Sequence, residues 1–116
     1  MNLTDIKHIK KARLIMTFEK IMEIFKKQFE IDKDIEVAKF RKGYQIFIWD
    51  DKKQAYIPNA ELIHSEEQLF SELLEETRRF YEWKYQYSSA CETPDNHKKE
   101  ISSIINELKN KFDESV

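Results

Sequence analysis

Metal-binding and nucleophilic side chains are few in this sequence, and their spacing matches no common site. Cys91 and His97 are separated by five residues, which is not a usual spacing for a zinc-binding pair, and no second cysteine exists. The stretch 32–36 begins like a calcium-binding loop, but Val37 stands where the sharp turn of that loop requires glycine. We therefore expect no metal site and no cofactor. The other ligands considered are His8, His64, Glu92 and Asp95.

The hydroxyl and thiol groups around position 90 could act as nucleophiles only with a base beside them. For Ser88, Ser89 or Cys91, a nearby histidine would have to lie within about 3 Å. Nothing in the sequence brings His97 that close, and a serine-rich loop between helices is ordinary. A glycine-rich phosphate loop is excluded because Gly43 is the only glycine. We therefore expect that the protein is not an enzyme.

The length and composition of the chain predict one folded domain over residues 1–116. A chain of 116 residues can bury a core, and 41% of them are hydrophobic, so the 36% that are charged do not indicate disorder. The single cysteine excludes an internal disulfide and fits a reducing compartment. No run approaches the roughly 20 apolar residues that a membrane span requires. We expect a cytoplasmic protein with no membrane partner.

The first half of the chain predicts a helix followed by a small antiparallel sheet. Apolar residues recur at helical spacing over residues 3–30, with Phe18 and Phe25 on the stripe. Short turns, one of them at Gly43, then separate three segments rich in β-branched and aromatic residues. These predicted strands cover residues 35–40, 44–49 and 54–57.

The second half of the chain predicts two helices. Residues 65–87 carry one broad apolar face, and Ser65 with Gln68 forms the capping-box pattern of a helix start. A loop over residues 88–96 follows, in which Pro94 favours the start of a last helix. The predicted fold class is α+β: a three-stranded antiparallel meander packed on a long N-terminal helix and a C-terminal helical hairpin, in the order α-β-β-β-α-α.

The middle strand is apolar on both faces. Ile46 and Ile48 point to one side, and Phe47 and Trp49 point to the other. Either helices cover both faces of the sheet, or one apolar face is open and meets a partner. The predicted core centres on Phe18, Phe25, Ile46, Ile48, Leu73 and Ile105.

An aromatic cluster near the end of the 65–87 helix is a candidate protein-binding surface. Trp83 points away from the apolar stripe of this helix, toward the positions of Tyr87 and Arg79. Tryptophan, tyrosine and arginine are the residues that most often anchor protein interfaces. The alternative is that the last helix covers Trp83. Trp49, beside the polar loop at 50–53, is a second candidate anchor.

The chain changes sign of charge halfway along. Residues 1–58 hold 13 basic and 9 acidic residues, and residues 59–116 hold 7 and 13. An α-β-β-β-α order with basic loops resembles double-stranded RNA-binding domains in topology. The net charge of −2 opposes tight binding to phosphates. The candidate nucleic-acid contacts are Lys7, Lys10, Lys11, Arg13, Arg41 and Lys42.

The absence of a catalytic constellation and the high aromatic content favour a binding function. We expect a small cytoplasmic protein, bacterial or phage, that binds another protein, as inhibitors, immunity proteins, antitoxins and phage anti-defence proteins do. The alternative is a nucleic-acid-binding regulatory protein that uses the basic N-terminal helix and the hairpin loops. The split charge is also compatible with a homodimer.

Overall fold

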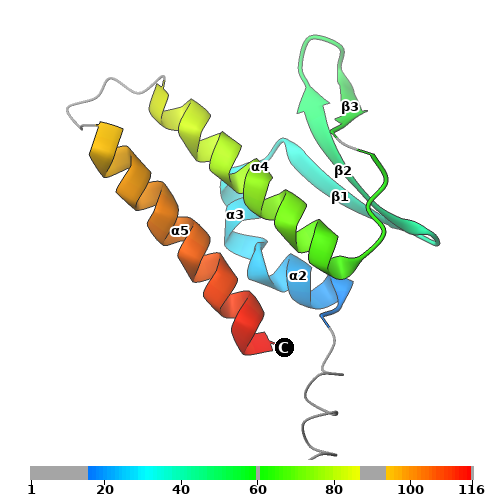
Figure 1. Ribbon diagram of the computed structural model, residues 1–116. Helices are drawn as coiled ribbons and strands as arrows, with labels where there is room; N and C mark the ends of the chain where they lie inside the picture. Colours follow the sequence, from blue (N-terminus) through cyan, green and yellow to red (C-terminus); the bar gives the residue numbers. More distant parts are fainter. Residues whose placement is uncertain (1–15, 60, 87–93, 116) are drawn as a thin grey trace, which may run out of the picture.

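The protein forms a three-stranded antiparallel sheet with helices packed on one of its faces (Figure 1). The computed structural model describes residues 16–59, 61–86 and 94–115. The mixed α and β composition and the antiparallel meander are as predicted. The elements are α2 (Phe18–Ile24), α3 (Lys26–Ile31), β1 (Ile35–Phe40), β2 (Gly43–Asp50), β3 (Ala55–Pro58), α4 (Glu66–Gln86) and α5 (Pro94–Ser115).

The N-terminal helical region differs from the single helix predicted over residues 3–30. Residues 3–15 lie outside the described part of the chain. In the rest, α2 and α3 are separated at Phe25, whose φ of −92° and ψ of 6° depart from helical values. The Phe25 side chain is fully buried, and its ring centroid lies 5.6 Å from that of Phe70 in α4. The interruption therefore lies at a main packing contact of the core.

The sheet has the order β1-β2-β3, and Gly43 allows a close approach at the start of β2. The backbones of Tyr44 and Ile63 exchange two hydrogen bonds of 2.8 Å. A Cβ atom at Gly43 would lie 2.4 Å from the carbonyl oxygen of Ile63. The sequence predicted a turn residue here, and the structure adds a steric reason for glycine.

The helical hairpin of α4 and α5 begins with the predicted cap. The Ser65 hydroxyl oxygen accepts a hydrogen bond from the Gln68 amide (3.1 Å), and the Gln68 side chain accepts one from the His64 amide (3.2 Å). Helix α5 begins at Pro94, inside the loop predicted over residues 88–96. Among the described helices, none is long and apolar enough to cross a membrane.

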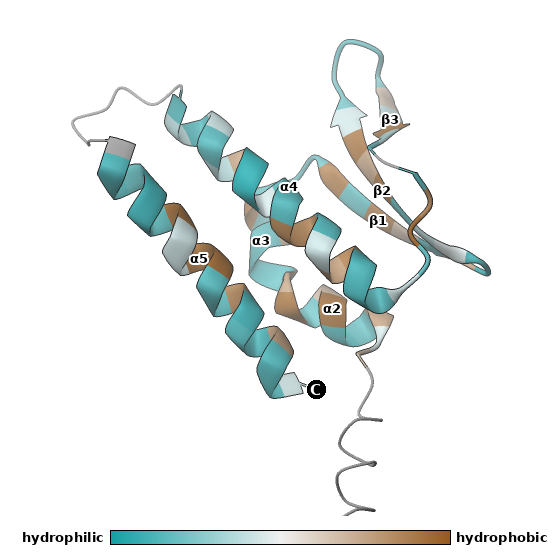
Figure 2. Cartoon of the chain, viewed as in Figure 1, coloured by the Kyte–Doolittle hydropathy of each residue, from teal (hydrophilic) through white to brown (hydrophobic). Residues whose placement is uncertain are grey.

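The core lies between the inner face of the sheet and the helices, and Figure 2 shows hydrophobic residues gathered on the sides of the helices that face one another. Of the six residues predicted at its centre, four are at most 2% exposed. Phe18 and Ile48 instead lie half-buried at its border. The ring of Phe18 stacks on Tyr44 with a centroid distance of 5.5 Å, which joins α2 to the sheet. The four central residues are Phe25, Ile46, Leu73 and Ile105.

Candidate functional site

The face of the sheet opposite the core carries four aromatic side chains. In β2, Ile46 is buried in the core, so Phe47 and Trp49 project to the opposite face, where both are half-buried. The strand register places Phe40 and Tyr56 on this same face, where they are 51% and 47% exposed. The helices pack on the other face (Figure 1). We call Phe40, Phe47, Trp49 and Tyr56 the outer sheet face.

Trp49 and Tyr56 form an aromatic pair on the outer sheet face. They lie directly opposite each other in the register of β2 and β3, with ring centroids 5.0 Å apart and an interplanar angle of 69°. This edge-to-face geometry is favourable for aromatic pairs. The indole Nε1 of Trp49 also donates to Asp51 Oδ1 at 3.4 Å. The pair therefore presents a fixed aromatic surface.

The apolar surface continues around the end of the β2–β3 hairpin. Ile48 and Ile57 are paired on the inner side of the sheet, but Ile57 remains 36% exposed. An open hollow of about 440 Å³ lies between Ile48, Ile57, Trp49 and the start of the hairpin loop. The loop is held by the Asp50 carboxylate, whose Oδ1 accepts hydrogen bonds from two loop amides at 3.0 and 3.1 Å. The hairpin end thus carries apolar side chains on both faces of the sheet, next to a hydrogen-bonded loop.

Charges of both signs surround the outer sheet face. Exposed Arg41 and Lys42 form the turn between β1 and β2 at one end. Exposed Glu36 lies opposite Phe47 in the register, in the middle of the face, and Asp51 lies beside Trp49. The four other basic residues proposed as nucleic-acid contacts, Lys7, Lys10, Lys11 and Arg13, lie outside the described residues.

The predicted aromatic cluster on α4 lies on a different element from the outer sheet face. Trp83 is 60% exposed, so α5 does not cover it. The Arg79 guanidinium contacts the Glu76 carboxylate, which also accepts a hydrogen bond from the Asn59 side chain after β3. Glu76 therefore links α4 to the segment after β3, and Arg79 pairs with it within α4. Tyr87 lies outside the described residues, and a binding role for this cluster stays a prediction.

The predicted metal and nucleophile candidates come together nowhere in the described residues. Residues 16–59, 61–86 and 94–115 contain no cluster of three or more His, Cys, Asp or Glu side chains that could hold a metal ion. The ring of His97 stacks on Tyr85 with a centroid distance of 4.4 Å, so it packs α5 against α4. The candidates Cys91, Ser88, Ser89, Glu92 and His8 lie outside the described part of the chain.

Among the described residues, Asp32, Tyr44 and Tyr81 have raised pKa values. Burial is the main cause that raises the pKa of Asp32, and the neighbouring Asp34 carboxylate adds to it. Burial also raises the pKa of Tyr44 and of Tyr81. The Tyr81 hydroxyl donates to Gln28 Oε1 at 3.0 Å inside the core. These shifts follow from packing and identify no reactive group.

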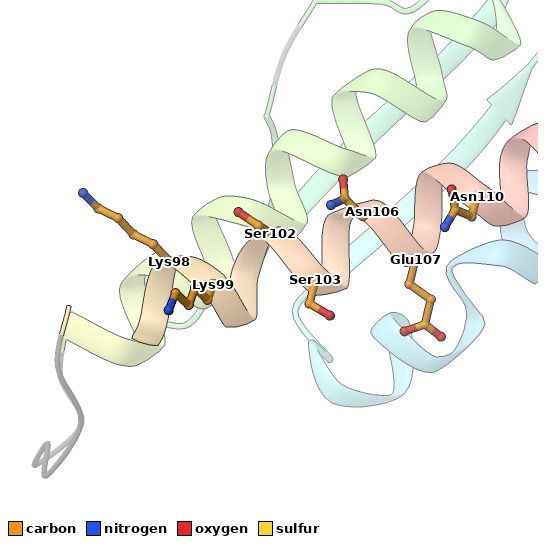
Figure 3. A pocket seen from close by; sticks show the side chains of 7 residues that line it. All are labelled: Lys98, Lys99, Ser102, Ser103, Asn106, Glu107 and Asn110. Atoms are coloured by element: carbon orange, nitrogen blue, oxygen red, sulfur yellow. The ribbon is translucent and has the colours of Figure 1, made fainter. Parts of the chain in front are cut away.

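A hollow of about 640 Å³ lies along the polar side of α5 (Figure 3). Every residue that lines it belongs to this one helix, so a ligand would meet a single wall. The side chains spread away from the helix and do not converge on one point. We therefore assign no site here. The lining residues are Lys98, Lys99, Ser102, Ser103, Asn106, Glu107 and Asn110.

Comparison with protein-family models, curated proteins and solved structures finds no match for this chain. The candidate site therefore rests on the geometry of the sheet. Sequence reasoning identified Trp49 but omitted Phe40 and Tyr56 as candidate contacts. Strand alternation carried across the two turns would have placed both on the face of Trp49, with Tyr56 directly opposite it, because the register fixes which residues share a face.

Proposed function

We propose that this small protein is cytoplasmic and non-enzymatic, and that it acts by binding another protein through the outer sheet face. The observation that carries the proposal is the Trp49–Tyr56 pair, which packs edge-to-face on a side of the sheet that the described helices leave uncovered. Large aromatic side chains on a rigid element bury much surface for little loss of conformational freedom. Inhibitors, immunity proteins, antitoxins and anti-defence proteins act by binding another protein.

The charges on the outer sheet face favour a protein over a nucleic acid. Glu36 places a carboxylate beside Phe47, and Asp51 places another beside Trp49. Both carboxylates would repel phosphate groups that followed the strands. A protein partner can instead match these carboxylates and the basic Arg41–Lys42 turn with complementary charges.

The proposal is tested by photo-crosslinking from defined positions of the full chain. A photoreactive phenylalanine analogue replaces Tyr56 on the outer sheet face, Trp83 on α4, or Lys98 on the polar side of α5. We expect one partner protein to be captured from position 56 and not from position 98. Capture from position 83 alone would move the interface to α4, and equal capture from all three positions would contradict a specific surface.

Binding measurements with the purified partner then test the energetic role of the surface. Tyr56→Ala is expected to weaken binding by about tenfold or more and to leave the melting temperature nearly unchanged, since Tyr56 is 47% exposed. Ile31→Ala is the matched control, because Ile31 is a similarly exposed hydrophobic residue (51%) on α3. Equal affinities of the two variants would contradict the proposal. A loss of about 2 kcal/mol for Trp83→Ala would add α4 to the interface.

A further inference from the structure

Strand β1 lies at one edge of the three-stranded sheet. The Trp49 amide donates to the Asp34 carbonyl, so the even-numbered residues of β1 face β2 in the alternating hydrogen-bond pattern. The amide and carbonyl groups of Ile35, Val37 and Lys39 therefore point away from β2. Within the described residues, β1 pairs with β2 alone.

A groove runs beside this edge. It has a volume of about 270 Å³ and lies between β1 and the helices α2 and α3. Met22 and Phe29 form its helical wall, and Ile35, Glu36 and Val37 form its strand wall. The side chain of Glu36 alternates with those of Ile35 and Val37 and belongs to the outer sheet face. Met22, Phe29 and Val37 are only half-buried. A strand edge beside an apolar groove is the arrangement that binds extended peptides by strand addition.

The side chains along the groove side of β1 define a charge pattern. Ile35 and Val37 lie between Lys33, which lines the groove, and Lys39. Lys39 makes an exposed ion pair with Glu19, at 3.8 Å, and its Nζ lies 5.7 Å from the centroid of the Phe18 ring. A ligand carboxylate can replace the exposed ion pair. Residues directly opposite each other in a pair of strands are stabilised by apolar contacts and by opposite charges. An extended segment that complements this side of β1 is apolar at two alternate positions and acidic on either side of them.

We propose that the free edge of β1 binds an extended acidic protein segment, which adds to the sheet as a fourth strand. Its backbone pairs with Ile35, Val37 and Lys39, and two alternate apolar side chains enter the groove. Carboxylates on either side of them pair with Lys33 and Lys39. This surface is separate from the outer sheet face, so the inference goes beyond the proposed function and does not depend on it.

A second copy of the chain fits this edge less well than an acidic segment does. An antiparallel pair of β1 strands centred on Val37 would place Lys33 opposite Arg41 at both ends. A pair centred on Ala38 would place Lys39 opposite Val37, so that cations replace the apolar contacts. Like charges directly opposite each other destabilise a strand pair.

The test uses the full chain and the peptide Glu-Thr-Glu-Thr-Val-Thr-Ile-Thr-Glu, which matches β1 in antiparallel register. One control peptide has lysine in place of each glutamate, and another is N-methylated at its valine and isoleucine. We expect the glutamate peptide to bind about tenfold more tightly than either control in calorimetric titrations. In NMR hydrogen exchange, it should slow exchange of the amides of Ile35, Val37 and Lys39.

Charge reversal in the protein provides the reciprocal test. The double variant Lys33→Glu and Lys39→Glu should prefer the lysine peptide, and both positions are exposed, so the fold is retained. Tyr56→Ala should bind the glutamate peptide as the unmodified chain does, which separates this inference from the proposed function. No binding at about 1 mM peptide, or equal binding of the N-methylated peptide, overturns the inference.

Amide hydrogen exchange of the protein without peptide shows whether a second copy or another segment of the chain already pairs with the β1 edge. Slow exchange of these three amides that grows with protein concentration assigns the edge to a second copy and overturns the proposal. Slow exchange at every concentration assigns it to another segment of the same chain, which also overturns it. Fast exchange in the free protein, slowed by the glutamate peptide, supports it.

Discussion

At the scale of single residues, burial separates side chains that hold the fold from those available for contact. Leu73 on α4 is 1% exposed, whereas Trp83 on the same helix is 60% exposed. The two positions lie on different sides of the helix because ten residues do not complete a whole number of turns. Truncation at each therefore has a different expected cost.

Leu73→Ala should lower the free energy of unfolding by on the order of 2–5 kcal/mol, through lost transfer energy and a cavity. Phe18→Ala should cost less, because Phe18 is half-buried and packs on the rim of the core against Tyr44. Urea denaturation measures both variants. A change below about 0.5 kcal/mol for Leu73→Ala would place that side chain on the surface.

Asp32→Asn should raise the free energy of unfolding at pH 7. Burial and the Asp34 carboxylate raise the pKa of Asp32 in the folded state, so its charged form opposes folding at neutral pH. Asparagine keeps the oxygen that accepts the hydrogen bond from the Asp34 amide. The gain should shrink as the pH falls toward the pKa of an unperturbed aspartate, where the folded protein already binds the proton. Thermal unfolding from pH 3 to 8 measures this dependence.

The matched control for this prediction is Asp34→Asn, which removes the same charge from an exposed neighbour. It relieves part of the repulsion on Asp32 but none of the burial, so its gain at pH 7 should be smaller. An equal gain for both variants would show that net charge, and not burial, causes the effect.

At the scale of the elements, close backbone contacts determine how the segment after β3 joins the sheet. Tyr44 and Ile63 exchange backbone hydrogen bonds, so the segment after β3 lies along β2 beside Gly43. This contact places the chain at the entry to α4, where Ser65 caps the helix. Gly43 is therefore coupled to the position of the helical hairpin.

Gly43→Ala should destabilise the protein by about 1–3 kcal/mol, because the new Cβ would lie 2.4 Å from the Ile63 carbonyl oxygen. Lys42→Ala is the control, since Lys42 is an exposed residue of the same turn. Denaturant titration measures stability, and hydrogen exchange at Tyr44 and Ile63 measures the loss of this pairing. Equal stabilities of the two variants would show that the backbone moves apart at no cost.

At the scale of the whole molecule, the distribution of charge limits the kinds of partner. The net charge is −2, and the basic residues of the first half are interspersed with acidic ones. Phosphate binding depends on a dominant positive face. The sheet instead combines the Arg41–Lys42 turn with Glu36 and Asp51.

Binding to DNA or RNA should accordingly be weak, with dissociation constants above about 10⁻⁶ M at physiological salt. Fluorescence anisotropy with single-stranded and double-stranded oligonucleotides measures this directly. A dissociation constant below about 10⁻⁸ M would place the protein among specific nucleic-acid binders and favour the alternative function.

Local sequence patterns determined the elements and their order in the described residues. The β-branched and aromatic runs predicted all three strands to within one or two residues of their observed bounds, and the Ser65–Gln68 pattern marked the start of α4. The alternation in β2 also showed that one apolar face would be open unless helices covered it. These features depend on neighbours a few residues apart, which a sequence displays directly.

Only the tertiary structure decided, for the described residues, which face of the sheet the helices cover and which strand lies at its edge. It placed Tyr56 beside Trp49 and Phe40 on the same face of the sheet, and it left Trp83 exposed, although the sequence allowed α5 to cover it. It also showed that the first helix is interrupted at Phe25, although the spacing of apolar residues over 3–30 predicted one continuous helix. These outcomes depend on contacts between residues far apart in the chain, where burial of the whole set of apolar side chains outweighs local preference.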